Sequence, residues 1–148
     1  MKINKRKTYD IHKTRTESLI LASACEWSVK YGYDSEDFLK KLMTSDWGIH
    51  VMNGDYHAEW VDALFLLFGF KHFVGLVKGK IYSEIQMEFI GYLYKYWVDS
   101  RNMSSVDVYR IAPPSKLIRH YSFLSTQECE YIIENLTDEY NSSLPERR

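Results

Sequence analysis

The 148-residue chain has few of the residues that cross-link, kink or loosen a polypeptide: two cysteines, three prolines and seven glycines. With 45% hydrophobic residues, this composition excludes collagen-like and wholly disordered chains. No apolar run approaches the roughly 18 residues of a membrane span, and the longest, residues 63–68, fits inside a buried helix. The basic N-terminus has no hydrophobic segment after it, unlike a signal peptide, so we expect a cytoplasmic protein with no membrane contact.

The common signatures of catalytic and metal sites are also missing. The sequence has no GxxxxGK(S/T), GxGxxG, HExxH or GxSxG motif. Cys25 and Cys129 are far apart in the sequence and outside any CxxC pair, so we expect separate, reduced thiols. The nearest approach to a metal-ligand cluster surrounds an Asn-Gly turn: His50, Asp55, His57 and Glu59. Its spacing matches no standard metal site. Together with the missing motifs, this leads us to predict no catalytic residue, no metal and no cofactor.

Positive charge is concentrated at the N-terminus. Residues 1–16 carry six cationic side chains against one acid, a charge of +5, so the rest of the chain carries −6 to give the total of −1. This pattern predicts a flexible basic arm at 1–13 on an acidic body. Such arms can bind nucleic acid phosphates, which makes a nucleic-acid-associated regulator our alternative function. Its contacts would be Lys2, Lys5, Arg6, Lys7, Lys13 and Arg15.

Capping residues and turns divide the chain into predicted helices. Thr14 and Glu17 have capping-box spacing before a helix to about Lys30, and Ser125 and Glu128 have it before a helix to about Glu139. Further helices are predicted at 36–43, 47–52, 57–68, 84–101, 105–111 and 115–123, with residues 53–54 as a turn between helices rather than a hairpin. The fold class is therefore all-α: a helical bundle with halves at 14–68 and 83–139, a connector at 69–82 and a loose tail at 140–148.

Two of these helices carry more apolar residues than one narrow stripe needs. The first contains Leu19, Ile20 and Trp27, and we expect it to be mostly buried. In the helix over 84–101, a row of large side chains recurs at helical spacing, which is typical of a core: Ile85, Phe89, Tyr92 and Tyr96.

The two halves show signs of an internal repeat. When the first half is laid on the second, identical residue types coincide at four places: Trp27 on Trp97, Ser35 on Ser105, Asp37 on Asp107 and His50 on His120. The order of long helix, polar turn and short helices is also shared. We predict a tandem duplication whose halves pack with pseudo-two-fold symmetry.

The second half also carries a longer pattern. The pattern has three segments. It begins an aromatic helix with Glu88-Phe89-Ile90, continues with Ser105-Val106-Asp107-Val108-Tyr109 and ends with Tyr131-Ile132-Ile133-Glu134-Asn135. Over positions 87–136, and faintly over 17–64, this resembles a family of small, functionally uncharacterised bacterial helical proteins whose repeating unit is about as long as half of this chain. Members are often encoded beside toxin-like genes, including ADP-ribosyltransferase-like ones. Ser125 stands where that family usually has His.

The resemblance implies an accessory or neutralising protein rather than a catalyst, and composition points the same way. Twelve tyrosines and four tryptophans exceed what the core needs, and both residue types are favoured at protein interfaces. The leading prediction is a non-catalytic, antitoxin-like protein that binds another protein, such as the product of an adjacent gene. An enzyme of unrecognised type is a second alternative. The expected contact residues are Tyr33, Trp47, Tyr56 and Tyr82.

Overall fold

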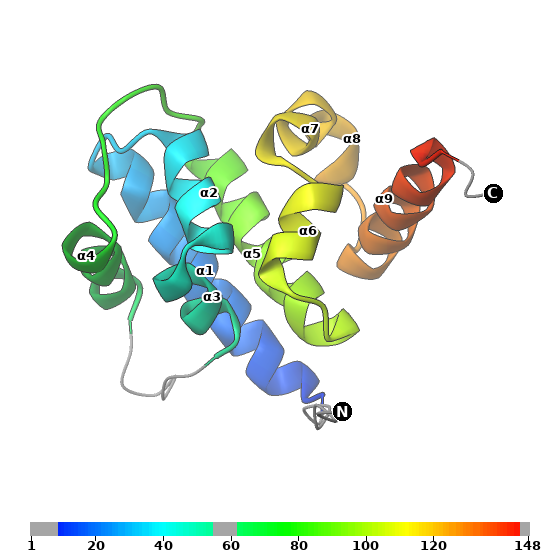
Figure 1. The fold of residues 1–148 in the computed structure, drawn as a ribbon, viewed down its shortest axis with the longest axis horizontal. Coiled ribbons are helices and arrows are strands. Elements are labelled where there is room, and N and C mark those ends of the chain that lie inside the picture. Colours follow the sequence, from blue (N-terminus) through cyan, green and yellow to red (C-terminus); the bar gives the residue numbers. More distant parts are fainter. Residues whose placement is uncertain (1–8, 55–61, 146–148) are drawn as a thin grey trace.

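The computed structural model describes residues 9–54 and 62–145 (Figure 1). In order along the chain, the helices are α1 (Ile11–Lys30), α2 (Ser35–Thr44), α3 (Asp46–Met52), α4 (Ala63–Phe73), α5 (Glu84–Arg101), α6 (Ser105–Ile111), α7 (Pro114–Arg119), α8 (Tyr121–Leu124) and α9 (Cys129–Ser143). These ranges contain no strand, only an isolated bridge between Tyr33 and Lys78. The predicted all-α bundle is confirmed.

The long helices α1 and α5 lie side by side in opposite directions and form the centre of the molecule (Figure 1). α4 packs on α1 at one end of the bundle, and α2 and α3 lie between α4 and the second half. α6 and α7 pack against α2 and α5, and α9 contacts α5 and α6 at the end opposite α4. One continuous core joins the two halves.

Small side chains allow α1 and α5 to approach closely. A Cβ atom on Gly91 of α5 would stand 2.8 Å from Cys25 Sγ and 2.8 Å from the Leu21 carbonyl oxygen of α1. A Cβ atom essentially never approaches another heavy atom this closely, so the helices can touch here only because residue 91 is glycine. Around this crossing, buried side chains from both helices fill the core: Leu21, Ala24, Cys25, Ile90, Tyr94 and Trp97.

A buried ionic cluster ties three helices together beside that crossing. Lys95 of α5 is 1% exposed, and its Nζ donates to the Met52 carbonyl at the end of α3 (2.7 Å) and to Asp99 Oδ1 (2.9 Å). Glu17 Oε2 of α1 lies 3.7 Å from the same Nζ, and the Thr14 hydroxyl donates to Asp99 Oδ2 (3.0 Å). The cluster therefore connects α1, α3 and α5 through hydrogen bonds and an ion pair that are largely shielded from water.

Both predicted capping boxes are wrong, for different reasons. Asp10 caps α1, accepting from the His12 and Lys13 amides, and Thr14 and Glu17 are buried within the helix as members of the ionic cluster. Residues 125–127 form a backbone turn that closes α8, and Glu128 precedes α9 without a side-chain cap. A true capping box begins α5, where the Ser83 side chain accepts from the Gln86 amide and the Gln86 side chain accepts from the Ser83 amide.

Several boundaries differ from the prediction. α1 starts at Ile11, inside the predicted arm, because Asp10 caps it. Asp62 caps α4, which then continues through Gly69, and residues 57–61 of the predicted helix lie outside the described residues. Gly69 lies against Trp47, where a Cβ would stand 2.8 Å from the indole Cζ2, so this glycine marks a close contact rather than a break. The predicted helix at 115–123 is split at His120, and α9 extends to Ser143.

The core row of α5 is only partly the predicted one. Tyr96 is buried, Phe89 and Tyr92 are half-buried, and Ile85 is 63% exposed. The fully buried row is formed instead by Met87, Ile90, Tyr94 and Trp97. The Tyr94 hydroxyl donates to the Ala112 carbonyl at the end of α6 (2.6 Å), which satisfies the polar end of a buried ring.

The tandem duplication stays a prediction. Ser35 and Ser105 are both buried and both occupy the first position of a short helix, α2 and α6. Their hydroxyls bond differently, because Ser35 Oγ accepts from the Tyr82 amide and Ser105 Oγ donates to the Met43 carbonyl. Trp97 is fully buried, whereas Trp27 is half-buried.

Gly91→Ala should destabilise the fold by about 1–3 kcal/mol because the new methyl group overpacks the α1–α5 contact. The effect should exceed the roughly 1 kcal/mol that alanine gains over glycine in a helix. Urea denaturation measures the change. Gly69→Ala is the matched control, since its methyl group meets only the side chain of the half-buried Trp47 and no backbone atom of another helix. Equal stabilities for the two variants would contradict the close-packing argument.

Lys95→Met should cost about 3–5 kcal/mol of unfolding free energy because it removes the ammonium group from beside the buried carboxylate of Glu17 and the partly buried carboxylate of Asp99. Lys41→Met is the matched control: Lys41 pairs with Asp37 at 2.8 Å, also within one helix, but close to the surface. That loss should stay below about 1 kcal/mol. Chemical denaturation of both variants gives the comparison. A similar small loss in both would show that the buried cluster does not depend on the ammonium group.

Candidate functional site

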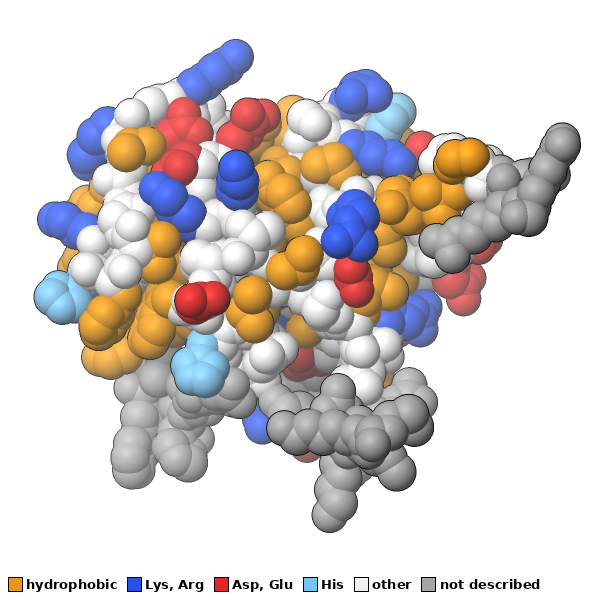
Figure 2. Space-filling model, in the orientation of Figure 1, with side chains coloured by type: hydrophobic (Ala, Val, Ile, Leu, Met, Phe, Trp, Pro, Cys, Tyr) orange, Lys and Arg blue, Asp and Glu red, His pale blue; other side chains and the backbone are white. Residues whose placement is uncertain are grey.

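The clearest surface feature is an apolar helix that is packed on one side only. Asp62 caps α4 by accepting from the Phe65 amide (2.8 Å), and the polar side chains of α4 are confined to Lys71 and His72 in its last turn. Its inner side is buried in the core through Ala63, Leu66, Leu67 and Phe70. Its outer side leaves Phe65, Phe68 and Phe73 exposed by 60%, 52% and 66%. Figure 2 shows hydrophobic side chains gathered at this end of the molecule.

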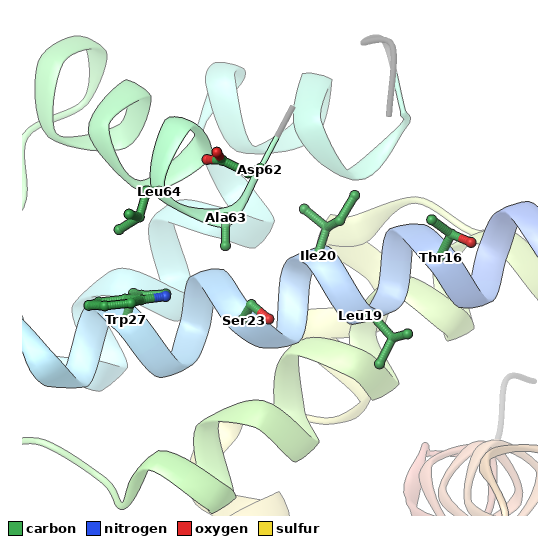
Figure 3. Close-up of a pocket in the computed structure, with 8 residues that line it drawn as sticks. All are labelled: Thr16, Leu19, Ile20, Ser23, Trp27, Asp62, Ala63 and Leu64. Carbon is green, nitrogen blue, oxygen red and sulfur yellow. The ribbon is translucent and has the colours of Figure 1, made fainter. Parts of the chain in front are cut away.

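An open cleft continues this apolar surface onto α1. It has a volume of about 540 Å³ and is lined by Thr16, Leu19, Ile20, Ser23, Trp27, Asp62, Ala63 and Leu64. In Figure 3, Leu64 of α4 lies over the Trp27 ring of α1, and Ala63 points toward Ser23. The expectation that the first helix is mostly buried is therefore correct for the side that faces α5 and wrong for Leu19, which is 60% exposed.

A row of aromatic rings connects the cleft with the outer side of α4. The ring centroids of Trp27 and Tyr31 are 6.2 Å apart, and those of Tyr31 and Phe68 are 6.3 Å apart in an edge-to-face contact. Lys30 Nζ lies 4.4 Å from the Trp27 centroid. We define the α1/α4 surface as the exposed and half-buried apolar residues of this region: Leu19, Ile20, Trp27, Tyr31, Leu64, Phe65 and Phe68.

The structure disperses the four predicted contact residues. Tyr33 is 6% exposed, so it belongs to the core rather than to the surface. Trp47 is half-buried against Phe73, with ring centroids 5.0 Å apart. Tyr82 is half-buried, and its hydroxyl donates to Glu36 (2.5 Å). Tyr56 lies outside the described residues. A partner contact through any of these residues stays a prediction.

The α1/α4 surface is absent from the sequence-based prediction because the run at residues 63–68 fits a buried helix. The signal that identifies it is the distribution of polar residues along α4. A helix that is apolar on all sides is either enclosed in a core or covered by something else. α4 has polar side chains only in its last turn and lies at an end of the bundle, where the core reaches only one of its sides.

The residues of the two other candidate sites are only partly described. Lys13 and Arg15 are exposed on α1, whereas Lys2, Lys5, Arg6 and Lys7 lie outside the described residues. Three members of the candidate metal cluster also lie outside the described residues: Asp55, His57 and Glu59. The fourth, His50, is exposed on α3. Within residues 9–54 and 62–145, no group of three or more His, Cys, Asp or Glu side chains is arranged to hold a metal ion.

Both thiols are held in their protonated form. Burial raises the pKa of Cys25 far above its usual range, and its Sγ packs against Gly91. Burial, with the nearby Glu130 carboxylate, raises the pKa of Cys129 to about 11. Because the thiolate is the reactive form, neither side chain is a strong nucleophile near neutral pH.

Charged residues join α1 to α5 beside the cleft. Lys30 lies 3.0 Å from Glu26 and 3.7 Å from Glu84. A hydrogen bond with the Glu26 carboxylate, and then burial, raises the pKa of Glu88. The same hydrogen bond, with one from Lys30, lowers the pKa of Glu26. The two carboxyl groups therefore share a proton more readily than isolated glutamates do.

No family model, curated protein or solved structure matches the chain. The resemblance to the bacterial helical family stays a prediction. Across the described ranges, every helix falls short of the length or the apolar composition that a bilayer crossing requires.

Glu88→Gln should raise the melting temperature at pH 7 and have little effect below pH 4.5. A raised folded-state pKa gives stability that is present below the usual value of 4.5 and is lost as pH rises through the folded pKa. Glutamine keeps a hydrogen-bond donor for Glu26 and removes the repulsion between two carboxylates. Melting curves from pH 3.5 to 8 measure the difference. Glu139→Gln, which weakens a surface ion pair with Lys116 away from this cluster, should give no such gain. A pH-independent effect of Glu88→Gln would contradict the shared proton.

Proposed function

We propose that this protein is a non-catalytic, antitoxin-like accessory protein of bacterial origin, and that it covers part of a partner protein with the α1/α4 surface. One observation carries the proposal: Phe65 and Phe68 of α4 are each more than half exposed beside an open apolar cleft. A contiguous apolar surface of this kind in contact with water is typical of an interaction site. Partner binding would complete the burial of α4 that the chain's own core begins.

The residues of the surface suit tight binding. Aromatic side chains that become fully desolvated carry most of the binding energy at protein interfaces, about 2 kcal/mol or more each. Phe68 is already oriented by its contact with Tyr31, and Trp27 is held under Leu64 in the cleft. Rings that are ordered before binding lose little conformational entropy when a partner arrives. Occlusion of the partner's own surface then requires no chemical step.

The partner we expect is a protein encoded beside this one. That expectation comes from the resemblance to the bacterial family whose members neighbour toxin-like genes. The nucleic-acid alternative uses a different part of the chain, the basic residues from Lys2 to Arg15. Because phosphate contacts weaken steeply with salt, whereas apolar contacts do not, one titration at two salt concentrations distinguishes the alternatives.

Phe65→Ala and Phe68→Ala should each weaken binding to the adjacent gene product by about 30-fold, the equivalent of about 2 kcal/mol. Phe123→Ala is the matched control: it removes a phenylalanine of 52% exposure, the same as Phe68, from α8. Isothermal titration calorimetry with the purified proteins gives the dissociation constants. Truncation to residues 9–148 removes Lys2, Lys5, Arg6 and Lys7 but keeps the Asp10 cap of α1, and it should leave these constants almost unchanged.

Equal effects of the α4 and α8 substitutions would place the interface elsewhere and contradict the role of the α1/α4 surface. Loss of binding on truncation, together with salt-sensitive binding of RNA or DNA, would favour the nucleic-acid regulator instead.

A further inference from the structure

Two lysines border the α1/α4 surface without a carboxylate partner among the described residues. Lys71 lies one helical turn beyond Phe68 on α4, on a neighbouring part of the helix surface. Lys78 lies with its Nζ 4.5 Å from the Tyr33 ring centroid and donates to the Tyr31 carbonyl. Both are exposed. In contrast, Lys30, Lys41, Lys95 and Lys116 each lie 2.8–3.0 Å from a carboxylate oxygen.

The carboxylates near the connector between α4 and α5 are already engaged by other groups. Asp34 accepts from the backbone amides of Asp37 (2.9 Å) and Lys80 (3.1 Å). Glu36 accepts from the Tyr82 hydroxyl, and Asp37 pairs with Lys41. No described carboxylate therefore forms an ion pair with Lys71 or Lys78, although Asp34 and Glu36 keep their negative charge near the connector. Figure 2 shows both cationic and acidic side chains near the hydrophobic ones on this side of the molecule.

We propose that the partner occupies the α1/α4 surface with an acidic amphipathic helix, whose carboxylates pair with Lys71 and Lys78. This inference rests on the proposed function and specifies the chemistry of its partner. Helices bind in apolar grooves through side chains spaced at i, i+3 or i+4, and i+7. Such a row would contact Leu64, Phe68 and Trp27, with acidic residues along its flank.

The charges also set the direction of the bound helix. Asp62, the cap of α4, stands at the end of the surface opposite Lys71, and one of its oxygens accepts from the Phe65 amide. An acidic segment is attracted to the lysine end and repelled from the Asp62 end. Charge pairs at the edge of an interface chiefly determine orientation, specificity and association rate, while the buried apolar contacts supply affinity.

The composition of the surface favours a protein helix over other occupants. Leu19, Ile20 and Leu64 are aliphatic, so they can pack on a helix but give bases nothing to stack on, whereas the four aromatic residues of the surface suit either occupant. The Asp62 carboxylate would also repel a phosphate backbone. A symmetric contact with a second copy of this chain would bring a second pair of uncompensated lysines to the same interface.

Two synthetic helical peptides of identical apolar pattern test the inference. One carries glutamates and the other lysines at the flanking positions, and binding of the full-length protein to each is measured by fluorescence anisotropy. We expect the glutamate peptide to bind at least tenfold more tightly in 50 mM salt, and the difference to shrink in 300 mM salt. The Phe68→Ala variant should weaken both peptides.

Charge reversal at the two lysines provides the matched test. The double variant Lys71→Glu/Lys78→Glu should prefer the lysine peptide, while Arg119→Glu, on exposed α7 at a distance from α4, should keep the original preference. Circular dichroism confirms that each variant is folded. No binding of either peptide, equal binding of both, or an unchanged preference in the double variant would overturn the inference.

Two competition experiments address the other occupants. If single-stranded oligonucleotides displace the peptide, or if the chain forms dimers that exclude it in sedimentation experiments, the surface belongs to nucleic acid or to a second copy. If Phe65→Ala and Phe68→Ala weaken binding to the adjacent gene product while the peptides show no charge preference, only the acidic-helix inference fails. If the phenylalanine substitutions do not weaken binding to the adjacent gene product and the peptides show no charge preference, the proposed function fails together with the acidic-helix inference.

Discussion

The contact between α1 and α5 is the constraint on which the rest of the bundle depends. It needs a glycine at position 91, because Cys25 and the α1 backbone occupy the space that any side chain would fill. Beside it, the buried Lys95 joins the end of α3 to both long helices through an ionic cluster in which Glu17 is buried and Asp99 is partly buried. A shift of either helix along the other would separate charges in a buried site, so packing and electrostatics select the same register.

This arrangement determines which part of α1 remains for other contacts. The side of α1 that faces α5 includes Leu21 and Cys25. Ile20 and Trp27 are left on the side near α4, and Leu19 points away from α4 toward solvent (Figure 3). α4 covers this stripe only in part, because its own inner side is directed at the core beside Phe38 and Trp47. The open cleft and the exposed phenylalanines are thus two results of one packing arrangement.

Charge is distributed so that the same surface has two unlike ends. Lys30 is paired with Glu26 and Glu84, whereas Lys71 and Lys78 form no ion pair with a described carboxylate. The overall excess of acid in the body therefore does not describe the local field at the surface that we propose for binding. An occupant of that surface responds to the nearest unpaired charges, since more distant ones are screened within about 8 Å in physiological salt.

The amino-acid sequence by itself determined the fold class and most helix positions, because these depend on residues within a few positions of one another. It did not determine the roles of Thr14 and Glu17, whose capping-box spacing is local but whose partners, Lys95 and Asp99, lie on α5 in the other half of the chain. Nor did it distinguish Leu66 from Phe65, neighbours of similar apolarity on α4. Only the tertiary structure decided that Leu66 enters the core and Phe65 meets water, since burial depends on what packs against each side of a helix.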